Sequence, residues 1–111
     1  MTRSDEVRLR HMLDAAREAL RFAAGRSRTD LDSDRMLVLS VVKSIEIIGE
    51  AASKVSEETQ RKHPTMPWID IVGMRNRLIH AYYDVDLDRV WDTLNADLPP
   101  LVSELESIVA D

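Results

Sequence analysis

The stretch that decides the fold is SDRMLVLSVVKSIEIIGEAASKV, residues 33–55. Placed on a helical wheel of about 100° per residue, its apolar side chains cover far more than half of the circumference. A helix that is apolar nearly all round is buried on more than one side. The narrow polar face carries Lys43, Glu46, Glu50 and Lys54. We therefore predict either the central helix of a bundle or a helix shared with a second subunit.

Helical periodicity continues on both sides of this stretch. A first helix is expected over residues 4–24, with Ser4 as its N-cap and Gly25 ending it. A polar connection fills residues 26–32. The other expected helices cover 56–62, 68–82 and 87–94, and a last one opens at Pro99 and Pro100. The chain has only three glycines, which also favours an all-α fold.

Composition indicates an ordinary globular protein. With 111 residues, 44% of them apolar and 32% charged, the chain is predicted to be one domain, residues 1–111. It has no cysteine, which rules out a disulfide or a thiolate metal site within this sequence. The first residues lack the apolar core of a signal peptide, and no uncharged run approaches the roughly 18 residues of a membrane span. We therefore expect a cytoplasmic protein without a membrane anchor.

The net charge of −5 bears on any role with nucleic acids. Proteins that coat nucleic acid are usually basic, because their affinity comes largely from neutralising phosphates. An enzyme needs only a local positive cleft. The acidic balance therefore argues against a general nucleic-acid binder more than against a nuclease.

The segment RNRLIHAY, residues 75–82, is the candidate for chemistry. Arg75 is followed after four residues by His80, and Tyr82 comes two residues later. Arginine binds phosphate through a permanently charged fork of donors, and histidine moves protons near neutral pH. The pair suggests chemistry on a phosphodiester. The three histidines of the chain are too scattered for a metal site, so no metal is predicted.

The expected helix over 68–82 predicts which way the side chains of this segment point. Arg75 falls in the middle of the apolar arc with Tyr82 about 20° away, and Asn76 and His80 form an i, i+4 pair on a polar edge. An arginine aimed at the core needs a partner or a cleft, and Glu46 and Glu50 are the candidate counter-ions. A structural ion pair between helices and a functional cleft both remain open.

Several stretches together match a known family. They are residues 45–52 (IEIIGEAA), 66–68 (MPW), 71–76 (IVGMRN), 78–82 (LIHAY), 85–86 (VD) and 90–91 (VW). On these residues the chain resembles the HEPN superfamily and, within it, the HepT-like toxins of prokaryotic type VII HepT–MntA toxin–antitoxin pairs. The resemblance implies a homodimeric bundle of four to five helices, with the motifs of two subunits facing each other across one cleft.

The resemblance also implies an activity, a metal-independent endoribonuclease without a cofactor that leaves a cyclic phosphate end. In that reading Arg75 stabilises charge on the phosphoryl oxygens, and His80 is the general base or acid. Asn76 would orient His80 or the phosphate, while Glu46 and Glu50 would support the site by holding Arg75.

The family resemblance assigns a regulatory role to the motif tyrosine. Tyr82 fills the position to which the partner, an MntA-like nucleotidyltransferase antitoxin, transfers AMP in the family. A negatively charged adduct beside the site would repel RNA. Tyr83 stands next to it, so which hydroxyl is modified stays open. Two alternatives to the toxin remain: a non-catalytic HEPN module that binds and regulates a nucleotidyltransferase, and a purely structural helical dimer.

Overall fold

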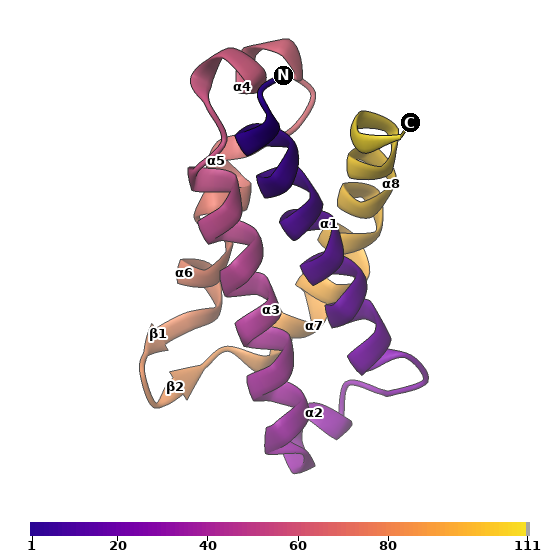
Figure 1. The fold of residues 1–111 in the computed structure, drawn as a ribbon. Coiled ribbons are helices and arrows are strands. Elements are labelled where there is room, and N and C mark those ends of the chain that lie inside the picture. The colour runs from indigo at the N-terminus through magenta and orange to yellow at the C-terminus, as the bar shows by residue number, and fades with distance from the viewer. Residues whose placement is uncertain (111) are drawn as a thin grey trace.

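Two long helices of opposite direction form the centre of the bundle. In the computed structural model, which describes residues 1–110, α1 covers Arg3–Ala23 and α3 covers Arg35–Ser53. The two helices lie side by side, and α8 lies on the other side of α1 (Figure 1). Helix α3 also contacts α2, α5, α6 and α7. The all-α bundle is therefore confirmed, and α3 is its central helix.

The boundaries of the first two long helices differ slightly from those predicted. Thr2, not Ser4, is the N-cap of α1, and its Oγ1 accepts the Asp5 N–H at 3.0 Å. Gly25 has a φ of 74°, a left-handed conformation that suits glycine at a helix end. The expected polar connection contains a short helix, α2 (Asp30–Ser33). Asp34 then caps α3, accepting the Leu37 N–H at 3.1 Å.

A buried carboxylate joins the start of α1 to the segment that follows α3. Asp5 is 3% exposed and accepts bonds from Ser56 N at 2.9 Å, Ser56 Oγ at 2.6 Å and Thr59 Oγ1 at 2.7 Å. Ser56 is also the N-cap of α4 (Glu57–Lys62), the short helix expected at 56–62. The bonds from Ser56 and Thr59 lower the pKa of Asp5 to about 2. Asp5 therefore holds two helices together as an anion.

Replacing Asp5 by asparagine should lower the free energy of unfolding by about 2 kcal/mol at neutral pH. The carboxyl has a lower pKa in the folded than in the unfolded chain, so its contribution is complete above pH 3.8 and is lost as the pH falls through about 2. Urea denaturation between pH 2 and 7 measures this. The same substitution at exposed Asp14 on α1 is the control, with an expected change below about 0.5 kcal/mol. Equal stabilities of the two variants at pH 7 would contradict the assignment.

The single helix predicted over residues 68–82 is wrong. The chain forms two short helices instead, α5 (Trp68–Val72) and α6 (Met74–Leu78), which meet at Gly73. A hairpin follows, in which β1 (Ile79–Ala81) pairs antiparallel with β2 (Asp84–Val85). The Asp86 N–H donates to the Leu78 carbonyl at 2.7 Å and so satisfies the end of α6. The residues after Leu78 therefore do not follow the helical wheel.

The C-terminal helices predicted at 87–94 and after Pro99 form one continuous helical path. Its parts are α7 (Leu87–Asp92), the π-helical turn η1 (Thr93–Asp97) and α8 (Leu98–Val109). The Leu98 N–H donates to the Thr93 carbonyl, a π-type bond. The prolines follow directly, in the first turn of α8, a position at which proline is tolerated.

A glycine allows the motif-bearing segment to lie directly on the central helix. A Cβ at Gly49 of α3 would lie 3.2 Å from the Val72 carbonyl oxygen and 3.3 Å from that of Ile71. Such distances are too short for an ordinary carbon–oxygen contact, so a side chain at residue 49 would push the end of α5 away. Helix α6 follows α5 immediately, and this close approach brings its first turn beside the polar face of α3.

Candidate active site

Arg75 lies at the surface of the bundle and does not point into the core as the wheel indicated. Its side chain is 44% exposed, because Met74 and Leu78 form the buried face of the five-residue helix α6. Its Nε lies 3.4 Å from Glu46 Oε2 on α3. The predicted counter-ion is thus confirmed for Glu46, but the pair is solvent-exposed and not a buried structural bridge.

The two predicted supporting carboxylates have different partners. Glu46 accepts a hydrogen bond from Lys43 Nζ at 3.0 Å in addition to its contact with Arg75. The Lys43 bond is the main reason that the pKa of Glu46 is lowered, and the positive charge of Arg75 adds to the effect. Glu50 lies 3.7 Å from Lys54 instead. The structure therefore places Glu46, and not Glu50, in position to hold Arg75.

A groove of about 510 Å³ opens where Arg75 meets α3. We call it the α1–α3 groove, since those two helices supply most of its lining. The lining residues are Arg8, His11, Lys43, Glu46, Ile47, Glu50, Ala51, Lys54 and Arg75. Four of them are arginine or lysine and two are glutamate, so the lining has a formal charge of +2 without the histidine. An acidic chain thus carries a local positive cleft.

Sequence reasoning missed two residues of this groove. Arg8 and His11 lie one turn apart on α1, and the packing of α1 against α3 brings them to the groove that Arg75 lines. Their i, i+3 spacing put them on one helix face. Nothing local to that face pointed to residue 75, because the contact between the two segments is long-range.

His80 lies outside that groove, on strand β1 of the hairpin, with 60% of its side chain exposed. Its Nδ1 lies 3.5 Å from Asp84 Oδ2, and its Nε2 lies 3.9 Å from Asp86 Oδ2. Neighbouring carboxylates can orient an imidazole ring and select its tautomer. The structure therefore gives His80 two acidic neighbours, Asp84 on β2 and Asp86 at the N-cap of α7.

The structure does not join the predicted motif residues directly. Asn76 lies on α6 and His80 on β1, so the expected i, i+4 pair on one helix edge is wrong. Within residues 1–110, no hydrogen bond or ion pair connects Arg75, Asn76 and His80. One chain thus presents an arginine in a groove and a histidine on a nearby hairpin as separate groups.

Tyr82 stands in the turn of the hairpin and is 93% exposed, so its predicted position toward the interior is wrong. Tyr83 is exposed as well, and the two rings meet edge to face with centroids 5.2 Å apart. The hydroxyl groups of both residues are accessible to another protein.

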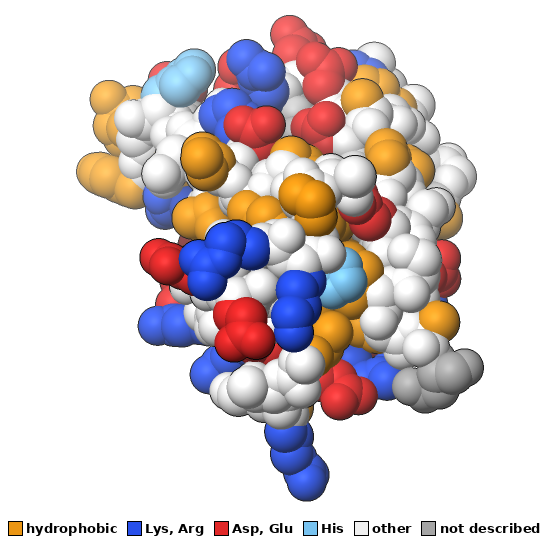
Figure 2. All heavy atoms as spheres, turned by 90° about the horizontal axis from the view of Figure 1, so that it is seen from above, with side chains coloured by type: hydrophobic (Ala, Val, Ile, Leu, Met, Phe, Trp, Pro, Cys, Tyr) orange, Lys and Arg blue, Asp and Glu red, His pale blue; other side chains and the backbone are white. Residues whose placement is uncertain are grey.

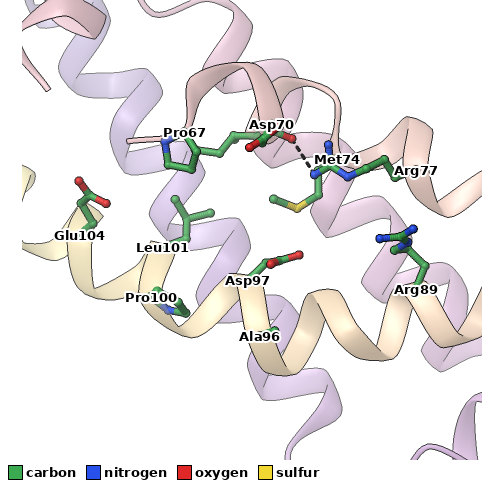
Figure 3. A pocket seen from close by; sticks show the side chains of 11 residues that line it. Pro67, Asp70, Met74, Arg77, Arg89, Ala96, Asp97, Pro100, Leu101 and Glu104 are labelled. Carbon is green, nitrogen blue, oxygen red and sulfur yellow. Dashed lines mark hydrogen bonds between the residues drawn. The ribbon is translucent and has the colours of Figure 1, made fainter. Parts of the chain in front are cut away.

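A second hollow, of about 460 Å³, lies between α5–α6 and the C-terminal helices (Figure 3). Arg77 and Arg89 lie toward one end and Glu104 toward the other, while Asp70 and Asp97 lie between them. Arg77 Nη2 donates to the Asp70 carbonyl at 2.9 Å. This hollow has three carboxylates and two arginines, so it suits a polyanion less well than the α1–α3 groove does. Its lining does not include Arg75, Asn76, His80 or Tyr82.

The end of the molecule around α4 shows no continuous basic face. Figure 2 shows basic and acidic side chains intermingled there, with apolar groups between them. Of the helices in residues 1–110, none combines the length and apolar character that a membrane span requires. The same residues contain no group of three or more His, Asp or Glu side chains arranged to hold a metal ion.

These features define a class of protein: a small helical bundle with a cationic groove and an exposed arginine–histidine motif. The family model described as "Ribonuclease HepT-like" matches residues 12–108. The chain belongs to this HepT-like ribonuclease family, a branch of HEPN. The resemblance drawn from the motif stretches is thereby confirmed.

Individual relatives agree with the family assignment. The chain is 35% identical over 101 residues, 91% of it and 90% of the relative, to a "Putative RNase" of Caldanaerobacter subterraneus subsp. tengcongensis. It is 37% identical over 79 residues, 71% of it and 72% of the relative, to a "Probable ribonuclease HepT" of Thermococcus cleftensis. A "Putative RNase" of Methanocaldococcus jannaschii is 30% identical over 97 residues, covering 87% of this chain and 89% of that protein. No solved structure gives a significant match.

Proposed function

We propose that the protein is a metal-independent endoribonuclease that uses Arg75 and His80 on one phosphodiester. The observation that carries the proposal is the position of Arg75 on a groove with a +2 lining in a chain whose net charge is −5. The family and its relatives, named as ribonucleases, support RNA as the substrate. The product would be a 2′,3′-cyclic phosphate end.

The reaction removes one proton from the RNA and adds one proton to it. The ribose 2′-oxygen forms a bond to the adjacent phosphorus as its proton passes to a base, and the bond from phosphorus to the 5′-oxygen breaks. The leaving 5′-oxygen takes up a proton. His80 serves one of these transfers, and Arg75 neutralises the negative charge that gathers on the phosphoryl oxygens. Asn76 binds the phosphate or His80, and Glu46 keeps Arg75 at the groove.

The working unit in this proposal is a homodimer, in which the motifs of two subunits share one cleft. Two observations support it. Arg75 lines the groove and His80 of the same chain does not, so a second copy can bring a histidine to the first copy's arginine. The central helix α3 also leaves Met36, Leu39 and Ile47 exposed, although its opposite face is buried. Apolar side chains exposed along a helix commonly mark a protein contact.

Cleavage of RNA by the purified protein tests the proposed activity. The unmodified protein, prepared without a nucleotidyltransferase, should shorten single-stranded RNA at internal positions, and EDTA should leave the rate unchanged. Full loss of activity in EDTA that Mg²⁺ restores would contradict the metal-independent mechanism. RNA that stays intact at high protein concentration would overturn the enzyme and leave the non-catalytic HEPN module.

The proposal includes a toxin role with an MntA-like nucleotidyltransferase as antitoxin, which transfers AMP to Tyr82. The support from the structure is the exposure of that ring on a hairpin next to His80. The added phosphate would place a negative charge beside the site and repel the RNA backbone.

Co-expression with the cognate nucleotidyltransferase should increase the intact mass of the protein by one adenylyl group and abolish RNA cleavage. Tyr82→Phe should remove the mass increase and keep the protein active, because only the hydroxyl accepts the group. Mass spectrometry of the intact chain measures this. Tyr83→Phe is the matched control and should still be modified. The reverse pattern would assign the modification to Tyr83.

A further inference from the structure

The walls of the α1–α3 groove come from three segments that are far apart in the sequence. Arg75 lies on α6, and Arg8 and His11 lie on α1. Lys43, Glu46 and Glu50 lie on α3, and Lys54 is its C-cap. A groove that a strand of RNA enters beside Arg75 therefore continues along α1. The strand has phosphates on both sides of the one that is cut, and these need partners too.

The charges of the groove are not equally available to a ligand. Lys43 is paired with Glu46, and Lys54 lies 3.7 Å from Glu50. Arg75 pairs with Glu46 through Nε at 3.4 Å, and no hydrogen bond of its guanidinium group is present within residues 1–110. Arg8 has no ion pair or hydrogen bond from its side chain to any residue among 1–110. The unneutralised charge of the groove thus belongs to two arginines, one on each wall.

Two guanidinium groups in one groove, neither of them hydrogen-bonded within residues 1–110, suit a ligand with repeated phosphates. Each group offers a planar fork of donors that matches phosphate oxygens. Positively charged grooves that follow the backbone are the usual site for single-stranded nucleic acid. An imidazole, as supplied by His11, can stack on a base or donate to a phosphate.

We propose that α1 supplies a second phosphate-binding position of the RNA site, at which Arg8, assisted by His11, binds a phosphate next to the one that Arg75 contacts. This rests on the proposed function for the identity of the strand. Arg8 and His11 are binding residues here: they hold the strand in register and take no part in the proton transfers. Substrate affinity should therefore depend on α1, and the rate of the bound complex should not.

Binding of a non-cleavable RNA measures this role separately from catalysis. A fluorescent single-stranded oligonucleotide with 2′-O-methyl groups cannot be cut, since its 2′-oxygens carry no proton. Arg8→Gln, which keeps the stem of the side chain, should weaken binding about tenfold and His11→Ala less. Arg8→Gln should also lower the slope of log Kd against log salt by about 0.7, the value for one lost phosphate contact on a single strand.

Arg21→Gln is the matched control. Arg21 is exposed on the same helix, about 220° round the wheel from Arg8, and does not line the groove. It should bind RNA like the wild type. With cleavable RNA, Arg8→Gln should raise KM and keep kcat. Thermal unfolding of each variant shows that the fold is intact.

The outcomes separate this inference from the proposed function. Arg8→Gln that binds with the same Kd and salt slope as Arg21→Gln, in a protein that cleaves RNA, would overturn the role of α1 and leave the nuclease. RNA binding that depends on Arg8 in a protein that cuts no RNA would support the site and overturn the nuclease. Wild-type protein that neither binds nor cuts RNA would overturn both.

Discussion

Replacing His80 by alanine should slow RNA cleavage by about 10²- to 10⁴-fold, the range for a general acid or base. The side chain is 60% exposed on the hairpin, so free imidazole can reach the space that the substitution leaves. Added imidazole should therefore restore part of the rate. A time course of oligonucleotide cleavage at saturating RNA measures both effects.

The control for this prediction is His63→Ala, at the end of α4, which should cleave at the wild-type rate. Rescue matters because a folding defect would not respond to imidazole. A His80→Ala protein that cleaves at the wild-type rate would remove His80 from the reaction, and a slow variant that imidazole fails to restore would give it a positioning role.

Replacing Arg75 by alanine should lower kcat by about 10²- to 10³-fold, as removal of one charge-stabilising donor does elsewhere. The stability of the fold should hardly change. The Arg75–Glu46 pair is 44% and 41% exposed, and exposed pairs are worth at most about 1 kcal/mol. Arg75→Lys should recover only part of the rate, because an ammonium group lacks the planar fork.

Arg77→Ala is the matched control for Arg75→Ala. It removes the same charge from the same helix, but Arg77 lines the other hollow. Cleavage rate and thermal unfolding should be measured for both variants. If Arg75→Ala lowers the free energy of unfolding by several kcal/mol and leaves cleavage unchanged, Arg75 is a structural ion-pair residue. That is one of the two interpretations that the sequence left open.

The central helices could be predicted because many residues in each of them carry the same helical pattern of apolar side chains. Helix α3 has so many apolar side chains that its predicted ends, 33 and 55, lie within two residues of the observed ones, Arg35 and Ser53. On α1, Leu9, Met12 and Leu13 recur at helical spacing and are buried. Long periodic segments average over local preferences, so their pattern is enough to predict a helical bundle.

The hairpin could not be predicted from helical periodicity. Ile79, with a φ of −120° and a ψ of 111°, has already left the helix one residue after Leu78. Its partner is Val85, six residues later, and no helical wheel contains that pairing. A β-branched residue followed closely by two adjacent tyrosines favours extended structure, and this was the available signal.

The error at the hairpin changes the picture of the site more than that of the fold. The wheel placed Arg75 and Tyr82 together at the interior, but both are exposed and on different elements. The contact of Glu46 with Arg75 was predictable, because Glu46 is a polar residue on a largely buried helix. Arg8 and His11 could not be placed at the groove from the sequence, because their position there depends on how two helices pack.

The groove also resolves the conflict between an acidic chain and an RNA substrate. Positive charge is concentrated on one lining, where two lysines and two arginines outnumber two glutamates. Affinity for RNA should therefore be local and sensitive to salt. General binding along the whole surface is not expected.

The end groups of the RNA product test the central claim most directly. An oligonucleotide that the wild-type protein cuts at one position should yield a 5′ fragment that carries a 2′,3′-cyclic phosphate, as read from its mass. The same oligonucleotide with a single 2′-deoxy nucleotide on the 5′ side of the cut should remain intact there. Cutting of the deoxy-substituted strand, or a 3′-hydroxyl on the 5′ fragment, would contradict attack by the 2′-oxygen and with it the roles given to Arg75 and His80.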